Sequence, residues 1–164
     1  MKIDFEAKKG FICDMYGVLY HGNRILPGAA DFVQWLQSNN KEYLFLTNNS
    51  GMTPKELQQK LGRMGLDVPE EHFYTSALAT AAFLKAQAPG CSAFVIGEAG
   101  LLNALYDAGI TMNDVNPEYV VIGEGRTYSL DTLTRAVNLV LGGAKLIGAN
   151  SDVSGNIEKG IAPA

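Results

Sequence analysis

Short apolar runs alternate with amphipathic segments through the first part of the chain. The apolar runs at residues 11–13 and 43–46 are too short for helices, which favours strands. Between them, residues 26–28 open a segment whose apolar side chains recur at helical spacing, and Asn39 and Asn40 end it. The pattern therefore predicts a β-α-β unit near the start of the chain.

The same alternation continues up to a proline-glycine pair. Thr53 has the character of an N-cap because a proline follows it at the first helical position, and Gly65 marks the end of that helix. A short run at residues 72–75 predicts a strand, and the alanine-rich segment at 76–88 predicts a helix. Strands that alternate with helices indicate a parallel sheet covered on both faces.

A weak internal repeat marks the second part of the chain. The run FVIGE at residues 94–98 is echoed by VVIGE at 120–124, and helical patterns follow at 101–108 and 130–141. A further strand is predicted at residues 145–148. We interpret the echo as two similar strand-to-helix corners in a second α/β module, because two copies are too few for a solenoid.

The Pro89-Gly90 pair lies between the two parts and is typical of a boundary. We therefore predict an α/β protein with one module at residues 1–89 and a second at residues 90–164. A length of 164 residues is enough to bury a sizeable core.

Composition argues against several function classes. The chain has 47% hydrophobic and 18% charged residues and a net charge of −4, so its charge does not favour nucleic acid as a partner. No apolar run approaches the length of a membrane span and the amino terminus carries acids, which predicts a cytoplasmic protein without a membrane partner. Cys13 and Cys91 lack metal-ligand spacing and are predicted to be reduced core residues.

Two polar residues follow the predicted strands of the first module. Asp14 comes directly after the run at 11–13, and Thr47 comes directly after the run at 43–46. Asp14 alone has two interpretations, a turn-forming aspartate or a functional carboxylate. Because adjacent parallel strands bring their carboxyl ends together, the pair favours a functional site. A carboxylate beside a hydroxyl and a turn rich in backbone N–H groups suits phosphoryl transfer.

The residues around these positions form a longer pattern. The chain contains ICDMYGVLYHG, LPGAADFVQWL and YLFLTNNSGMT, followed by TSALATAAFL, FVIGEAGL and DVNPEYVVIGE. The first three segments resemble the opening motifs of the haloacid-dehalogenase-like hydrolases, in particular the NagD-like sugar-phosphate and nucleotide phosphatases. The other three resemble that branch's link into its α/β cap domain and the cap itself. The resemblance implies a Rossmann-like three-layer core, present in part, with an inserted cap.

The resemblance also implies a role for each polar residue of these motifs. Asp14 would be the nucleophile that forms an aspartyl-phosphate, and its carboxylate would bind Mg²⁺ together with the backbone carbonyl of Tyr16. Thr47, Asn48 and Asn49 would bind the phosphoryl group that is transferred. Water would then hydrolyse the aspartyl-phosphate. The implied activity is Mg²⁺-dependent hydrolysis of a small phosphorylated metabolite.

Tyr16 departs from the family pattern, in which a second aspartate protonates the leaving group and then activates water. A phenol, with a reference pKa of about 10, can donate a hydrogen bond but is a poor base at neutral pH. Loss of general acid–base catalysis typically costs about 10²- to 10⁴-fold in rate, so we expect weak turnover. The resemblance further implies that residues 18–26 form a flap over the site.

The chain ends at Ala164, whereas the family carries a lysine and an acidic pair of the Mg²⁺ site after the cap. Asp14 with one carbonyl is then expected to hold Mg²⁺ weakly, because the ion favours octahedral oxygen coordination. Half a core would also leave a sheet face and a strand edge uncovered, which a homo-oligomer would cover. Two alternatives stay open: a non-catalytic homologue that serves as a binding or oligomerisation module, and a fragment of a longer protein.

Other polar residues have weaker claims. His21 and His72 lack partners at metal or triad spacing, and we interpret both as packing or solvent-facing residues. Asn150 and Asp152 resemble a family segment near the return from the cap, where a substrate-facing role and a capped turn both stay open. Arg126 follows a strand of the second module, and a solvated arginine is favoured there over an anion-binding one.

Overall fold

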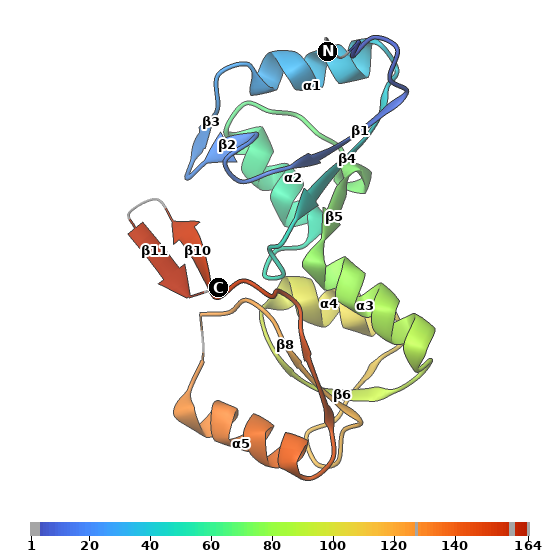
Figure 1. The fold of residues 1–164 in the computed structure, drawn as a ribbon, viewed down its shortest axis with the longest axis vertical. Helices are drawn as coiled ribbons and strands as arrows, with labels where there is room; N and C mark the ends of the chain where they lie inside the picture. The colour runs from blue at the N-terminus through green and yellow to red at the C-terminus, as the bar shows by residue number, and fades with distance from the viewer. Residues whose placement is uncertain (1–3, 127, 158–159, 164) are drawn as a thin grey trace. The chain divides into compact units, whose positions relative to one another are not determined.

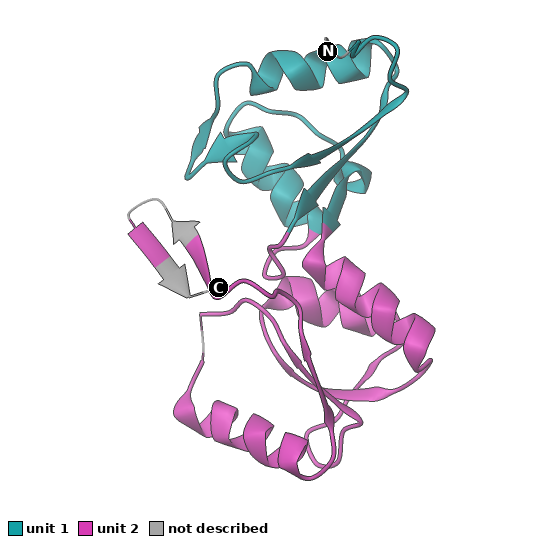
Figure 2. Cartoon of the chain, viewed as in Figure 1, with its two compact units in different colours: residues 1–47, 54–74, 157–159 teal, residues 48–53, 75–156, 160–164 magenta. Residues whose placement is uncertain are grey.

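The computed structural model describes residues 4–126, 128–157 and 160–163. The chain divides into two compact units (Figure 2). Unit 1 comprises residues 1–47, 54–74 and 157–159, and unit 2 comprises residues 48–53, 75–156 and 160–164.

Unit 1 is built around a sheet with the strand order β1-β4-β5 (Figure 1). Its main elements are β1 (Gly10–Asp14), α1 (Ala29–Ser38), β4 (Glu42–Thr47), α2 (Pro54–Arg63), the 3₁₀ turn η1 (Glu70–His72) and β5 (Phe73–Thr75). β1 and β4 pair in parallel, with Gly10 opposite Glu42 and Asp14 opposite Leu46. This confirms the predicted β-α-β unit.

One face of the unit 1 sheet is packed and the other is exposed. On the packed face, the ring of Phe11 meets Trp35 of α1 edge-on at 5.5 Å, and Phe45 is fully buried. The alternate positions point the other way, and Ile12 is 72% exposed and Leu46 is 37% exposed. For the described residues of unit 1, this agrees with the expectation that a partial core leaves a sheet face uncovered, whereas the alternation of strands and helices taken alone predicted a sheet covered on both faces.

The segment predicted as a flap forms a small hairpin that the hydrophobic pattern did not indicate. β2 (Tyr20–His21) pairs antiparallel with β3 (Arg24–Ile25), and Tyr20 lies opposite Ile25. Gly22 has φ 58°, the left-handed conformation that glycine adopts without strain in a tight turn. The hairpin is too short to show the alternation that predicts a strand.

Unit 2 contains a parallel sheet with the strand order β7-β6-β8-β9. Its elements are α3 (Ser76–Gln87), β6 (Ser92–Ile96), α4 (Ala99–Asp107), β7 (Thr111–Met112), β8 (Tyr119–Ile122), α5 (Leu130–Leu141) and β9 (Lys145–Gly148). β10 (Ser154–Ile157) and β11 (Gly160–Pro163) form a separate two-stranded sheet. The bounds of α5 and β9 coincide with the predicted ones.

Helices cover both faces of the unit 2 sheet, which is the second α/β module that the sequence predicts (Figure 1). On one face, α3 and α4 contribute Leu84 and Leu105 to a core cluster that includes Ala93 of β6. On the other face, α5 contributes Ala136, which packs against Val120 of β8. Unit 2 is thus a three-layer α/β unit.

The helix α3 belongs to unit 2. The predicted boundary at Pro89-Gly90 grouped this helix with the first module, whereas its buried residues Ala77, Ala81 and Leu84 lie in the unit 2 core. Because α3 is alanine-rich, its small side chains allow close packing against α4, and no feature of the local pattern shows which sheet it covers.

The loop at residues 48–53 is seated on unit 2 by a close backbone approach. Ser50 is fully buried, and the backbone N–H of Gly100 in α4 donates to the carbonyl of Gly51 at 3.0 Å. A Cβ added at Gly100 would lie 2.7 Å from the backbone of Ser50 and of Met52. Only glycine therefore fits at this position of α4.

Replacing Gly100 with alanine is expected to lower the free energy of unfolding by about 1–3 kcal/mol, because the loop backbone must move away from α4. The matched control is Gly62→Ala in α2, where an added Cβ meets nothing within 4 Å. Alanine there should raise the stability by about 0.5–1 kcal/mol through its higher helix propensity. Urea denaturation of both variants measures the difference, and equal effects would contradict the close approach.

Candidate active site

Asp14 lies exposed at the carboxyl end of β1. Its Oδ1 accepts a hydrogen bond from the backbone N–H of Met15 at 2.7 Å. This is the contact expected of an aspartate that stabilises a turn, the first of the two interpretations of Asp14. The turn contact uses Oδ1 and orients the carboxyl group at the strand end. A turn-stabilising role and a chemical role are therefore compatible in this residue.

Thr47 ends the neighbouring strand β4 and is 9% exposed. Since Asp14 lies opposite Leu46, Thr47 is one position further along the same edge of the sheet. The structure thus brings Asp14 and Thr47 to the carboxyl ends of adjacent parallel strands, the edge at which open α/β sheets bind ligands. Their individual roles stay predictions.

Tyr16 is half-buried and sits among other rings. It packs edge-on against Tyr20, with ring centroids 5.6 Å apart, and against His21 at 5.0 Å. Its hydroxyl is buried and has no hydrogen-bond partner among the described residues. A buried unpaired hydroxyl is unfavourable unless something else binds it, so Tyr16 is a candidate to contact a ligand.

Asn48 and Asn49 follow Thr47 in the chain and belong to unit 2. The Nδ2 of Asn48 donates to Asp152 Oδ2 at 2.7 Å, and the Nδ2 of Asn49 donates to Glu124 Oε2 at 2.5 Å. Asp152 was considered from the sequence, whereas Glu124 was not assigned any role. The sequence feature that could have drawn attention to Glu124 is the repeated Gly-Glu pair after each of the two similar strands.

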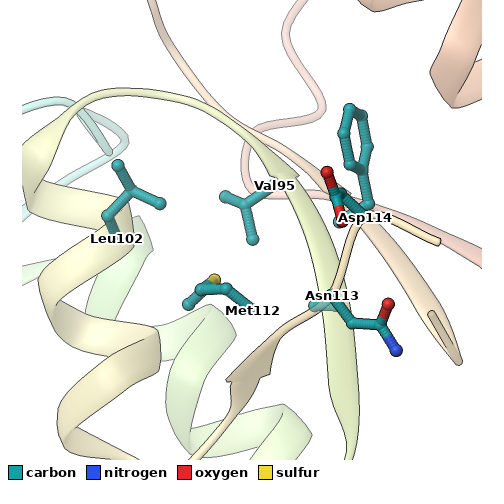
Figure 3. A pocket seen from close by; sticks show the side chains of 7 residues that line it. Val95, Leu102, Met112, Asn113 and Asp114 are labelled. Carbon is teal, nitrogen blue, oxygen red and sulfur yellow. The ribbon is translucent and has the colours of Figure 1, made fainter. Parts of the chain in front are cut away.

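A cavity of about 240 Å³ lies elsewhere in unit 2 (Figure 3). It is lined by Val95 of β6, Leu102 of α4 and Met112 of β7, with Asn113 and Asp114 at its polar side. None of the predicted site residues lines it. We therefore do not place the chemistry of this protein there.

Comparison with known proteins decides the family. Residues 11–111 match the family described as haloacid dehalogenase-like hydrolase. The chain belongs to the haloacid dehalogenase-like hydrolases. The matched segment includes both predicted strand-end residues, Asp14 and Thr47, and it extends from β1 to β7.

Two curated relatives of this haloacid dehalogenase-like hydrolase are phosphatases by name. It is 50% identical over 154 residues to dihydroxyacetone phosphatase of Corynebacterium glutamicum (strain R), covering 94% of this chain and 56% of that protein. It is 43% identical over 147 residues to ribonucleotide monophosphatase NagD of Escherichia coli (strain K12), covering 90% and 58%. The chain thus spans less than two thirds of the length of these relatives.

Solved structures share the fold. NagD from Escherichia coli K-12 superposes with a TM-score of 0.86 at 41% identity, covering 94% of this chain and 61% of that chain. A 4-nitrophenylphosphatase from Thermotoga maritima superposes with a TM-score of 0.90 at 30% identity, covering 96% and 60%. These likenesses confirm the α/β class with its Rossmann-like core and the NagD-like resemblance.

The described residues do not form a complete metal site. They contain no group of three or more histidine, cysteine, aspartate or glutamate side chains placed to hold a metal ion. The predicted ligands are the Asp14 carboxylate and the Tyr16 carbonyl. Two oxygens do not make the octahedral set that Mg²⁺ demands, so the site does not fit the ion as a complete cage.

The two cysteines carry free thiols, as predicted, but only Cys91 is buried in a core, whereas Cys13 is half-buried. Cys13 precedes Asp14 in β1, and burial raises the pKa of its thiol. Burial and then the nearby charge of Glu118 raise the pKa of the Cys91 thiol. Both thiols are therefore held further toward the protonated, unreactive form at neutral pH.

The remaining polar candidates have structural partners. His72 stacks on the ring of Tyr43 at 3.8 Å, and its Nδ1 lies 2.9 Å from the Tyr43 carbonyl oxygen, so packing explains it. The backbone N–H of Arg126 donates to Glu98 Oε1 at 2.8 Å.

No helix in the described part of the chain is long and apolar enough to cross a membrane.

Replacing Tyr16 with phenylalanine is expected to raise the free energy of unfolding by about 1 kcal/mol, because the change removes an unpaired buried hydroxyl. The matched control is Tyr43→Phe, since the hydroxyl of Tyr43 accepts a hydrogen bond from Gln37 Nε2 at 3.3 Å. That variant should lose about 1 kcal/mol. Thermal and urea unfolding measure both, and equal losses in the two variants would contradict the orphaned hydroxyl.

Proposed function

We propose that this protein is a phosphomonoester hydrolase that acts on a small phosphorylated metabolite through an aspartyl-phosphate on Asp14. The observation that carries the proposal is the exposed Asp14 carboxyl at the end of β1, beside the strand β4 that leads into Thr47 and Asn48. The names of the relatives, a dihydroxyacetone phosphatase and a ribonucleotide monophosphatase, support the same reaction class.

The reaction proceeds in two displacements at phosphorus. In the first, Asp14 Oδ2 attacks while its Oδ1 is held by Met15 N–H, the ester P–O bond breaks, and the leaving alcohol takes up a proton. In the second, water attacks phosphorus and releases inorganic phosphate and the free carboxylate. Thr47, with the side-chain and backbone N–H groups of Asn48 and Asn49, holds the phosphoryl oxygens during both steps.

The second step is the slow one in this chain. The Tyr16 hydroxyl can donate a hydrogen bond to the leaving oxygen, but a neutral phenol is a poor base for activating water. Mg²⁺ would be held by the Asp14 carboxylate and the Tyr16 carbonyl, and it would neutralise phosphoryl charge when bound. With so few ligands, its affinity is expected to be weak.

Assays with 4-nitrophenyl phosphate and Mg²⁺ test the proposal. We expect slow hydrolysis by the chain as written, no hydrolysis by Asp14→Asn, and a gain of about 10²-fold or more in Tyr16→Asp, because a carboxylate restores acid–base catalysis. The Cys13→Ser variant is the control for a neighbouring residue that is not the nucleophile. Fast turnover by the chain as written would refute the impairment, and activity that survives Asp14→Asn would refute the assignment of the nucleophile.

The exposed sheet face supports a second candidate, a non-catalytic binding or oligomerisation module. Ile12 is 72% exposed on the uncovered face of the unit 1 sheet, and Leu46, on the same face of the neighbouring strand, is 37% exposed. Adjacent apolar side chains on an open sheet favour association. The occupant we propose is the same face of a second copy of the chain.

Sedimentation measurements on the full chain test this second candidate. We expect a homo-oligomer that dissociates in the Ile12→Lys variant, because a charge cannot be buried in an apolar interface without a partner. Val115→Lys is the control, since Val115 is 81% exposed but lies in unit 2. A monomer at every concentration, or equal dissociation in both variants, would exclude the interface. The non-catalytic function itself requires that Asp14→Asn change neither Mg²⁺ binding nor phosphate release.

A further inference from the structure

The repeated Ile-Gly-Glu corner of unit 2 brings two glutamates to the same edge of one sheet. β6 ends at Ile96 and β8 ends at Ile122, and these two residues lie opposite each other in the parallel pairing. The backbone N–H of Gly123 donates to the carbonyl of Ile96 at 2.8 Å, which continues the pairing into the corner. Glu98 and Glu124 therefore leave the sheet from equivalent positions on neighbouring strands.

The two glutamates nevertheless hold different segments. Glu98 Oε1 accepts from the backbone N–H of Arg126 within the second corner, at 2.8 Å. Glu124 Oε2 accepts from Asn49 Nδ2 at 2.5 Å, and the backbone N–H of Glu124 donates to Ser50 Oγ at 2.7 Å. The second corner thus binds two consecutive residues of the loop at 48–53.

The shape of the corner shows that the loop is closely seated there. A Cβ added at Gly123 would lie 2.7 Å from Ser50 Oγ, so a side chain at this glycine would displace the fully buried serine. The Asn49 side chain is held at both ends, because its Oδ1 also accepts from Met52 N–H at 2.9 Å. Its rotamer is therefore set by Glu124 on one side and by its own loop on the other.

The charge of Glu124 argues against direct binding of a phosphoryl group. A carboxylate has acceptors and no donor at neutral pH, and it repels a phosphate dianion. Its observed role is to accept a hydrogen bond from the Asn49 side chain. The arrangement suits a residue that acts through Asn49 and does not touch the substrate.

We propose that Glu124 is a positioning residue for the phosphate-binding loop, which it fixes through Asn49 and Ser50. The proposal rests on the proposed function only in the assignment of the loop at 48–53 to phosphate binding. If the loop is already held in its binding conformation, less conformational entropy is lost when phosphate binds. The affinity for phosphate should therefore depend on Glu124. It should not depend on Glu98, which has the equivalent place but holds Arg126.

The chain offers a matched set of variants. Glu124→Met keeps the length of the side chain and removes the acceptor, and Glu124→Gln keeps an acceptor oxygen and removes the charge. Glu98→Met makes the same change at the equivalent corner. Hydrogen exchange of the backbone amides at 48–53 measures the seating of the loop, and calorimetry with inorganic phosphate and Mg²⁺ measures binding.

In Glu124→Met we expect exchange at 48–53 and the phosphate Kd each to rise about tenfold, the effect of losing one charge-assisted hydrogen bond. Glu124→Gln should retain phosphate binding and the slow exchange, and Glu98→Met should change neither. Exchange in the β6 core serves as the internal control for global unfolding.

Unchanged exchange at 48–53 in Glu124→Met, or the same acceleration in Glu98→Met, would overturn the positioning role whatever the activity of the protein. Failure of Glu124→Gln to retain the slow exchange would do the same. If the loop loosens specifically but the unmodified protein binds no phosphate, the proposed function fails, and the phosphate-binding part of this inference fails with it.

Discussion

The parallel pairing of β1 with β4 is the interaction on which the candidate site depends. Ladder hydrogen bonds set Asp14 opposite Leu46, and that register brings the ends of two strands to one edge of the sheet. A shift by one residue would turn Asp14 toward the packed face beside Phe45 and turn the apolar neighbours outward. The packing of Phe11 against Trp35 and the burial of Phe45 therefore hold the carboxylate in place, because they select the register that exposes it.

The chain beyond β4 is constrained in a different way. After Thr47 the backbone enters unit 2, where residues 48–53 lie against α4 and the corner after β8. Glycine at positions 100 and 123 allows this approach, and the buried Ser50 hydroxyl accepts a hydrogen bond from the backbone N–H of Glu124. The segment that follows the strand end is thus positioned by long-range packing, while the strand end itself is positioned by the sheet.

Membership of the haloacid dehalogenase-like hydrolases and the position of Asp14 agree on phosphoryl transfer as the chemistry of the proposed function. Tyr16 is the local feature that works against it. Its ring packs against Tyr20 and His21, yet its hydroxyl has no hydrogen-bond partner in the part of the chain that the structure describes. An aromatic ring at this position packs well against its neighbours, whereas the proposed acid–base chemistry requires a carboxylate there.

The sequence by itself determined the helices, the longer parallel strands and the family. Periodicity and capping are local, so α5 and β9 could be predicted with correct bounds, and the motif around Asp14 identified the lineage. Tertiary structure alone decided that α3 packs in unit 2 and that Ile12 and Leu46 lie on the exposed face of the unit 1 sheet. It also decided that Glu124 meets Asn49, a contact across 75 positions of the chain. Such contacts depend on how sheets and loops pack in three dimensions, and they cannot be predicted from the spacing of hydrophobic residues, which reports local structure.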